Sequence, residues 1–246
     1  LLLQAYGLTE SAPLLTLQHQ KKPVKGTVGP PIPETEIRIV DDNYKDLPAG
    51  EKGIILARGP QIMPGYYKNP QGTAKVLSPD KWLDTGDLGM LTCRGELIIT
   101  GRAKDTIVLL DGENVEPAPI EEALRDSAYI EQAVVLGQDQ KFLSALIVPD
   151  LERLSEYAAE KRIEYSGPED LIGSPEIHTL ITHEIRTQVS PKNGFKNFEQ
   201  IFRFKLLPES FQVDKELSLK REVMRHAVNE LYRKEIEELL QLDASR

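Results

Sequence analysis

The sequence is poor in the features that mark several classes of protein. It has one cysteine, Cys93, so no disulfide can form within the chain, and its place in a strand pattern predicts an inert buried thiol. No apolar run approaches the ~18 residues that a membrane-spanning helix needs. With 30 basic against 39 acidic side chains, the net charge is −9, which excludes a chain-wide attraction for nucleic acid. The four histidines lack zinc-protease spacing and are expected at the surface.

The N-terminal stretch LLLQAYG has no basic flank and no small-residue cleavage site, so it is not a signal peptide. It also has no initiator methionine, and residues 1–5 are typical of a buried strand. We therefore expect the chain to be the C-terminal part of a longer protein.

The single cysteine fits a reducing compartment and favours a cytoplasmic location. The length of 246 residues allows one large domain or two smaller ones.

The pattern of apolar residues changes near Gly101 to Asp105. Before it, strand patterns alternate with Gly and Pro turns, as in a small barrel or sandwich, at 36–41, 53–59, 83–87 and 96–100. After it, strands and helices mix. Strands are predicted at 106–110, 130–137, 142–148 and 198–206, and helices at 117 onward, 151–162, 175–189 and 219–240. In the first of these helices, Glu121 is placed to pair with Arg125 one turn on.

The segment YGLTE near the start of the chain combines groups that suit a nucleotide. Gly7 after a strand end lets the backbone approach a ligand closely, and Tyr6 can offer its ring to a purine. Thr9 can donate its hydroxyl to a phosphate oxygen, and Glu10 supplies the hard oxygen that Mg²⁺ prefers. The alternative is a strand-to-loop turn with a buried tyrosine.

The segment LDTGDLG places Asp84 and Asp87 on either side of a Thr-Gly turn. A carboxylate there can accept both hydroxyls of a ribose, or it can cap an Asx turn. In GRAKD, Arg102 offers a permanent charge to ribose or phosphate, or else makes a surface ion pair. In DGENVEP, Gly112 follows Asp111 in a typical hairpin turn.

Five segments resemble, in their order and spacing, the adenylate-forming superfamily, which includes acyl-CoA synthetases, luciferases and peptide synthetase adenylation domains. These segments are YGLTE, MPGYYKNP, LDTGDLG, GRAKD and DGENVEP. The run GENVEP and the long segment 151–198 resemble its long-chain fatty acid–CoA ligase branch. The resemblance assigns Glu10 to the metal, Lys104 to the hinge of a mobile domain and Gly112 to the thiol tunnel. It assigns the nucleotide to Tyr6, Gly7, Thr9, Asp87 and Arg102.

The resemblance also implies an α/β (α+β) fold in two parts. Residues 1–101 would be the strand-rich, barrel-like last subdomain of the large AMP-binding domain, truncated at its N-terminus. Residues 102–246 would be the small, mixed α+β C-terminal domain, which swings about a hinge near Lys104.

Two departures from the family stand out. Its Ser/Thr/Gly-rich phosphate loop is absent and is expected upstream of Leu1, together with most of the acyl pocket. The family also has a catalytic lysine that reaches the carboxylate and the α-phosphate during adenylation, and Ser218 takes its position here. Lys220 is the candidate replacement, because in an extended run residues 218 and 220 share one side. The alternatives are Lys215, or slow or absent adenylation.

The activity implied by the resemblance is that of a long-chain fatty acid–CoA ligase, an ATP-dependent acid–thiol ligase that uses ATP, Mg²⁺ and coenzyme A. The fragment alone is expected to be inactive, because it lacks the phosphate loop. The predicted partners are a fatty acid, ATP and coenzyme A, with no nucleic acid and no membrane span but with room for peripheral membrane contact. One alternative is an acyl-carrier-protein synthetase, whose acceptor is a protein-borne thiol. Another is a non-catalytic relative that kept the nucleotide site, which Ser218 motivates.

Overall fold

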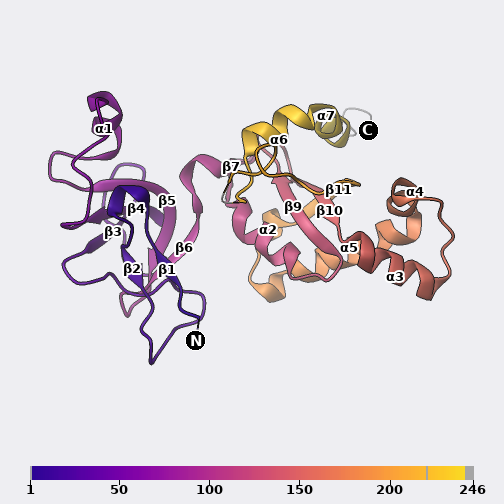
Figure 1. Cartoon of the computed structure of the whole chain (residues 1–246), viewed down its shortest axis with the longest axis horizontal. Coiled ribbons are helices and arrows are strands. Elements are labelled where there is room, and N and C mark those ends of the chain that lie inside the picture. The colour runs from indigo at the N-terminus through magenta and orange to yellow at the C-terminus, as the bar shows by residue number, and fades with distance from the viewer. Residues whose placement is uncertain (1, 220, 242–246) are drawn as a thin grey trace. The chain divides into compact units, whose positions relative to one another are not determined.

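The computed structural model describes residues 2–219 and 221–241 (Figure 1). The chain divides into two compact units, Leu1–Lys104 and Asp105–Arg246. Each unit has its own sheet and its own buried clusters, so each is described separately. The division falls inside the 3₁₀ turn η2 (Ala103–Asp105).

The first unit is built on an open antiparallel sheet in the order β3-β4-β5-β6. Its strands are β3 (Glu36–Val40), β4 (Gly53–Arg58), β5 (Leu83–Leu91) and β6 (Leu97–Arg102). Strand alternation brings Ile39, Ile55 and Leu97 together in a buried cluster. No strand pairing closes this sheet within the described residues, so the barrel-like expectation is corrected to an open sheet.

Short elements lie beside this sheet. The strand β1 (Ala5–Tyr6) pairs antiparallel with β2 (Thr16–Leu17), and η1 (Thr9–Ser11) lies between them. The expected buried strand over residues 1–5 is wrong for its described part, since Leu2 is 92% exposed and the ladder begins only at Ala5. The helix α1 (Pro70–Val76) was not predicted, although the Asn-Pro step signals its start: the Asn69 side chain accepts the N–H of Gly72 at 2.8 Å.

Cys93 is exposed, which overturns the expectation of a buried thiol. It lies in the turn between β5 and β6, where the Gly95 amide donates to the Thr92 carbonyl oxygen at 2.9 Å. Gly95 has a φ of +76°, a conformation that favours glycine, and β5 has already ended at Leu91, before Cys93.

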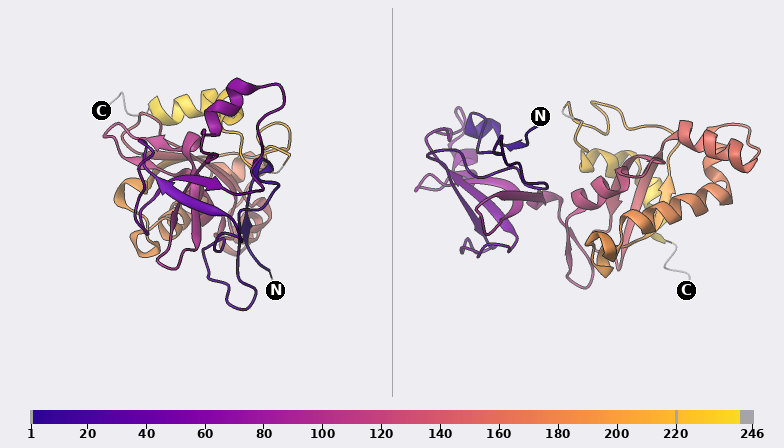
Figure 2. Two further views of the ribbon diagram at one scale, coloured as in Figure 1. Left: turned by 90° about the vertical axis from the view of Figure 1, so that its left-hand side faces the viewer. Right: turned by 90° about the horizontal axis from the view of Figure 1, so that it is seen from below.

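The second unit centres on a three-stranded sheet in the order β11-β10-β9, with β10 antiparallel to β9 and parallel to β11. Its strands are β9 (Ile130–Leu136), β10 (Leu143–Pro149) and β11 (Ile201–Leu206). Every residue of β10 is buried, because helices cover both faces of the sheet (Figure 2). The expected mixed α/β fold is thus confirmed.

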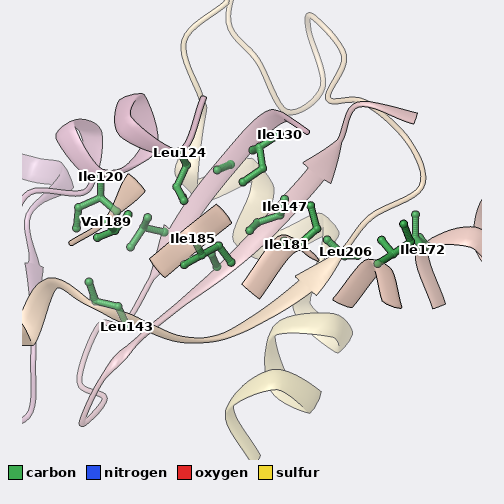
Figure 3. Close-up of a cluster of buried hydrophobic side chains, with 14 of the residues drawn as sticks. Ile120, Leu124, Ile130, Leu143, Ile147, Ile172, Ile181, Ile185, Val189 and Leu206 are labelled. Atoms are coloured by element: carbon green, nitrogen blue, oxygen red, sulfur yellow. The ribbon is translucent and has the colours of Figure 1, made fainter. Parts of the chain in front are cut away.

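One face of this sheet carries the larger buried cluster (Figure 3). There Leu143, Ala145 and Ile147 of β10 pack against the first four helices of the unit. These are α2 (Pro117–Arg125), α3 (Leu151–Lys161), α4 (Pro168–Gly173) and α5 (Pro175–Gln188). The turns η3 (Pro191–Asn193) and η4 (Asn197–Glu199) lead from α5 to β11. The helix α4 lies between the helices predicted at 151–162 and 175–189 and was not itself predicted, and Pro168 occupies its first turn.

The opposite face is covered by α6 (Arg225–Leu231) and α7 (Arg233–Gln241), through residues such as Val228 and Leu239. The single helix expected at 219–240 is therefore wrong at its start and is broken near Tyr232. Leu217 instead pairs with Val223 at the base of a small hairpin. No helix within the described residues is long and apolar enough to cross a membrane.

Candidate nucleotide site

The first unit brings together three of the predicted nucleotide residues. The Tyr6 hydroxyl donates to Asp87 Oδ2 at 2.7 Å, and Arg102 Nε lies 3.6 Å from Asp87 Oδ1. Asp87 and Arg102 are direct partners in the β5–β6 ladder. Asp87 is 8% exposed, so its charge is stabilised mainly by these groups rather than by bulk water.

A bulge in β5 directs Asp87 toward Tyr6. In the ladder with β4, Ile54 pairs with Leu88 and Leu56 with Asp84, so three residues of β5 lie opposite Ile55 alone. Gly86 has a φ of +70°, which suits such a bulge. The Thr85 hydroxyl fixes it by donating to the Ile55 carbonyl oxygen at 2.8 Å and accepting the Asp87 amide at 3.2 Å.

The two aspartates of LDTGDLG have different surroundings. Asp84 Oδ1 accepts the Gly86 amide at 2.9 Å, and Asp84 Oδ2 accepts the Tyr44 hydroxyl at 2.9 Å. Asp84 is thus the residue that makes the Asx turn, while Asp87 points at Tyr6 and Arg102. Both lie within β5, as the strand predicted over 83–87 implies, and the Thr-Gly turn expected between them is the bulge of that strand.

The Tyr6 phenol is a permanent donor. Burial, and then the charge and hydrogen bond of Asp87, raise the pKa of Tyr6 far above its usual value. Gly7 follows, and a Cβ atom there would lie 1.6 Å from the Pro13 carbonyl oxygen. This close approach is to the chain's own backbone, so it requires glycine independently of any ligand.

Glu10 lies in η1 and is tied to the MPGYYKNP segment. Glu10 Oε1 accepts the Tyr66 hydroxyl at 2.8 Å, and the Glu10 carbonyl oxygen accepts the Met63 amide at 2.8 Å. The sequence matched MPGYYKNP to the family, but the hydrogen bond from Tyr66 to Glu10 was not predicted. Thr9, the first residue of η1, is exposed.

The described residues hold no cluster of three or more His, Cys, Asp or Glu side chains suited to a metal. A site of the type that Mg²⁺ uses with nucleotides, one carboxylate plus phosphate oxygens and water, is still compatible with Glu10.

In the second unit, Gly112 closes a hairpin between β7 (Ile107–Val108) and β8 (Asn114–Val115). Its φ is +87°, its amide donates to the Leu109 carbonyl oxygen at 2.9 Å, and a Cβ there would meet no atom within 4 Å. Gly112 is thus the glycine of an exposed turn, while Ile107, Leu109 and Val115 of the same hairpin are buried. Lys104 is exposed within η2.

The region of the family's lysine is a tight hairpin. The Ser218 amide donates to the Glu222 carbonyl oxygen at 2.8 Å, and the Arg221 amide donates to the Ser218 carbonyl oxygen at 2.8 Å. The chain reverses direction here, so the premise of an extended run, on which the choice of Lys220 rested, is wrong. Lys220 itself lies outside the described residues. Lys215 Nζ lies 3.4 Å from Glu216 Oε1.

Comparison with known proteins identifies the family. Residues 1–67 match the AMP-binding enzyme family, and residues 104–243, more than half of the chain, match the AMP-binding enzyme C-terminal domain. The chain belongs to the AMP-binding enzymes. This confirms the resemblance to the adenylate-forming superfamily.

Individual relatives place this AMP-binding enzyme near the long-chain ligases. It is 47% identical over 163 residues to a chloroplastic long-chain-fatty-acid–[acyl-carrier-protein] ligase of Arabidopsis thaliana, covering 62% of this chain and 22% of that protein. It is 34% identical over 213 residues to human long-chain-fatty-acid–CoA ligase 1, covering 86% of this chain and 30% of that protein. The chain therefore spans less than a third of the length of either relative.

Among solved structures, the AMP-binding enzyme resembles the adenylation domain of a carboxylate reductase from Mycobacterium chelonae. The TM-score is 0.76 at 26% identity, over 96% of this chain and 34% of that chain. The fold of an adenylation enzyme is thus supported by sequence and by structure.

Proposed function

We propose that the protein containing this chain is an ATP-dependent long-chain fatty acid–CoA ligase. The observation that carries the proposal is the cluster of Tyr6, Asp87 and Arg102, which come from three separate segments of the chain. Such convergence of an aromatic ring, a carboxylate and a guanidinium suits a nucleoside with its phosphate. Similarity to a human long-chain fatty acid–CoA ligase supports a long-chain fatty acid as the acid substrate and coenzyme A as the thiol.

In this proposal, Asp87 accepts the ribose hydroxyls and Arg102 adds a positive charge beside the ribose and phosphate. Asp87 already receives the Tyr6 hydroxyl at 2.7 Å, which fixes the carboxylate before a nucleotide arrives. The Tyr6 ring is then held at the edge of the same cluster, where it can contact the purine.

Thr9 and Glu10 follow Tyr6 closely enough in sequence to serve the phosphates. The Thr9 hydroxyl would donate to a phosphate oxygen. Glu10 would hold Mg²⁺ together with phosphate oxygens, and the ion would neutralise charge on the triphosphate. The Tyr66 hydroxyl, at 2.8 Å from Glu10 Oε1, would orient that carboxylate.

The reaction has two steps. The fatty acid carboxylate attacks the α-phosphorus of ATP, and the bond from that phosphorus to the oxygen bridging it to the β-phosphorus breaks. Pyrophosphate departs, and an acyl adenylate is formed. The thiol of coenzyme A then attacks the acyl carbon and AMP leaves. Positioning and charge neutralisation supply most of the rate in such phosphoryl chemistry. Lys104 would be the hinge between the two steps, and the exposed Gly112 hairpin would line the path of the thiol.

ATP–pyrophosphate exchange with a long-chain fatty acid, measured on the full-length protein, tests the proposal. Exchange that depends on the fatty acid, followed by acyl-CoA formation when coenzyme A is added, is expected. Nucleotide binding without exchange would instead favour the non-catalytic relative that Ser218 motivates.

An acyl-carrier-protein ligase is the second candidate. The 47% identity over 163 residues to a plant ligase of that name favours it, and the first half-reaction is the same. Comparing coenzyme A with an acyl carrier protein as acceptor separates the two. A cytoplasmic location and peripheral membrane contact stay predictions.

The catalytic cation is the least defined part of the proposed site. Lys220 stays the proposed replacement for the family lysine, because it is the next basic residue after Ser218 in the sequence. Lys215 is the alternative, and its ammonium is engaged by Glu216 at 3.4 Å.

A further inference from the structure

Glu216 is a buried carboxylate that holds together the loop between β11 and α6. Its side chain is 1% exposed. Glu216 Oε2 accepts the Gln212 amide at 2.9 Å, and Oε1 accepts the Tyr232 hydroxyl at 3.1 Å. Lys215 Nζ lies 3.4 Å from Oε1. A carboxylate this buried is tolerated only where such donors replace water.

Glu216 and Tyr232 have pKa values on opposite sides of neutral pH. Burial by itself disfavours the charged carboxylate, but the hydrogen bonds from Gln212, Tyr232 and Lys215 and from the Glu216 backbone together leave the pKa of Glu216 below its usual value. Burial and the adjacent Glu216 charge raise the pKa of Tyr232 to about 12. At neutral pH, Glu216 is therefore an anion and Tyr232 is a donor.

The hairpin 217–223 extends directly from Glu216. The Glu216 carbonyl oxygen accepts the Met224 amide at 2.8 Å, which closes the base of the hairpin. Leu217 is 7% exposed and packs in the cluster beneath α6 and α7, whereas Leu219 near the tip is 80% exposed. The base of the hairpin, where Leu217 and Val223 pack in this cluster, therefore determines its direction.

The other arm of the hairpin has its own anchor. Arg225, the first residue of α6, pairs with Glu121 at 2.6 Å and donates to the Val135 carbonyl oxygen at 3.0 Å. This ties α6 to α2 and β9. On the arm that precedes Ser218, the corresponding charged anchor is Glu216, which ties the chain to Tyr232 at the end of α6.

We propose that Glu216 is a positioning residue for the adenylation half-reaction, because it fixes the direction of the hairpin that carries Ser218. The inference rests on the proposed function, in which this segment supplies the cation for the adenylation half-reaction. A displacement of about 1 Å can lower a rate by about a hundredfold. A loosened hairpin therefore impairs adenylate formation without touching the chemistry of the thiol.

The test compares Glu216→Gln and Tyr232→Phe with the control Glu230→Gln in the full-length protein. Glu230 is an exposed carboxylate on α6, whereas Tyr232→Phe removes one donor and keeps the ring that packs on Phe211. We expect ATP–pyrophosphate exchange to fall about tenfold to a hundredfold in Glu216→Gln and less in Tyr232→Phe. Transfer from a synthetic acyl adenylate to coenzyme A should stay within about twofold, and the control should match the wild type.

Amide hydrogen exchange on the same variants reports on the anchoring itself. The amides of Ser218 and Arg221 should exchange faster in Glu216→Gln, while those of β10 keep wild-type rates. Unchanged Ser218 and Arg221 amides would overturn the anchoring. Equal loss of both half-reactions would make Glu216 a stability residue and overturn the positioning role. A wild-type protein that shows no ATP–pyrophosphate exchange would overturn the proposed function, and with it the role of Glu216 in adenylation. The amide exchange rates would still report whether Glu216 anchors the hairpin.

Discussion

The Tyr6 hydroxyl donates to Asp87 Oδ2 at 2.7 Å, although the two residues are 81 positions apart in the sequence. This bond joins the YGLTE segment to the bulge in β5. It occupies one carboxylate oxygen of Asp87, while Arg102 lies beside the other. The two motifs therefore meet in one cluster of side chains, which gives the first prediction.

Asp87 should matter more than Asp84 for nucleotide binding. Replacing a charged acceptor of ribose hydroxyls costs on the order of 1.5 to 3 kcal/mol, or about tenfold to a hundredfold in affinity. Asp84 makes only a local turn and a bond to Tyr44, so Asp84→Asn should leave affinity near wild type. Titration calorimetry with ATP on both full-length variants decides between them. A larger loss in Asp84→Asn would show that the aspartates are assigned the wrong way round.

Gly7 should be intolerant of a side chain. Its added Cβ would lie 1.6 Å from the Pro13 carbonyl oxygen, so Gly7→Ala must displace backbone and should destabilise the first unit by about 1 to 3 kcal/mol. Gly167→Ala is the matched control, since a Cβ there meets no atom within 4 Å. Thermal unfolding of both variants measures the difference. Equal melting temperatures would contradict the close approach.

Lys104 should act as a hinge in the full-length protein. Lys104→Pro fixes φ near −65°, so it should change adenylation and thioester formation by unequal factors. Lys104→Ala removes the same charge and leaves the backbone free, and it should keep both rates near wild type. The two half-reactions are followed by pyrophosphate exchange and by acyl-CoA formation. An equal loss of both steps in Lys104→Pro at unchanged stability would argue against the hinge.

Ser218 takes the position where the family has a lysine, so three variants locate the catalytic cation. If Lys220 has replaced it, Lys220→Ala should abolish pyrophosphate release, because a neutral serine cannot stabilise two anions. If Lys215 has replaced it, Lys215→Ala should do so. A rise in Ser218→Lys with no loss in either alanine variant would indicate a weakened enzyme. No change in any of the three would mean that the lysine position is misaligned.

Glu216 should make the stability of the second unit pH-dependent. Its pKa is lowered in the folded protein, so its contribution is present above the usual pKa of about 4.3 and is lost as pH falls through the folded value. The gap in melting temperature between wild type and Glu216→Gln should be constant from pH 6 to 8 and shrink below about pH 4.5. Scanning calorimetry across this range measures it. A gap that widens in acid would mean that the sign of the pKa change is wrong.

Residue spacing alone predicted several strands correctly and identified the family. Alternation placed β3 and β4 within one residue of their bounds, and the Gly and Asp residues of LDTGDLG marked a backbone irregularity at Gly86. The motif order also indicated Asp87 as the nucleotide carboxylate. These features depend on residues close together in the chain, whose spacing is visible without a fold.

The partners of the buried charged side chains depend on how distant segments pack together. Glu121 was expected to pair with Arg125 one turn on, but its carboxylate binds Arg225 and the Val135 amide, and Arg125 donates to the Glu121 carbonyl oxygen instead. Burial explains the difference: Glu121 is 8% exposed, so it needs donors that approach from β9 and α6. In the same way, Tyr6 meets Asp87 and Glu216 meets Tyr232 because packing brings distant segments together, and no local spacing encodes those distances.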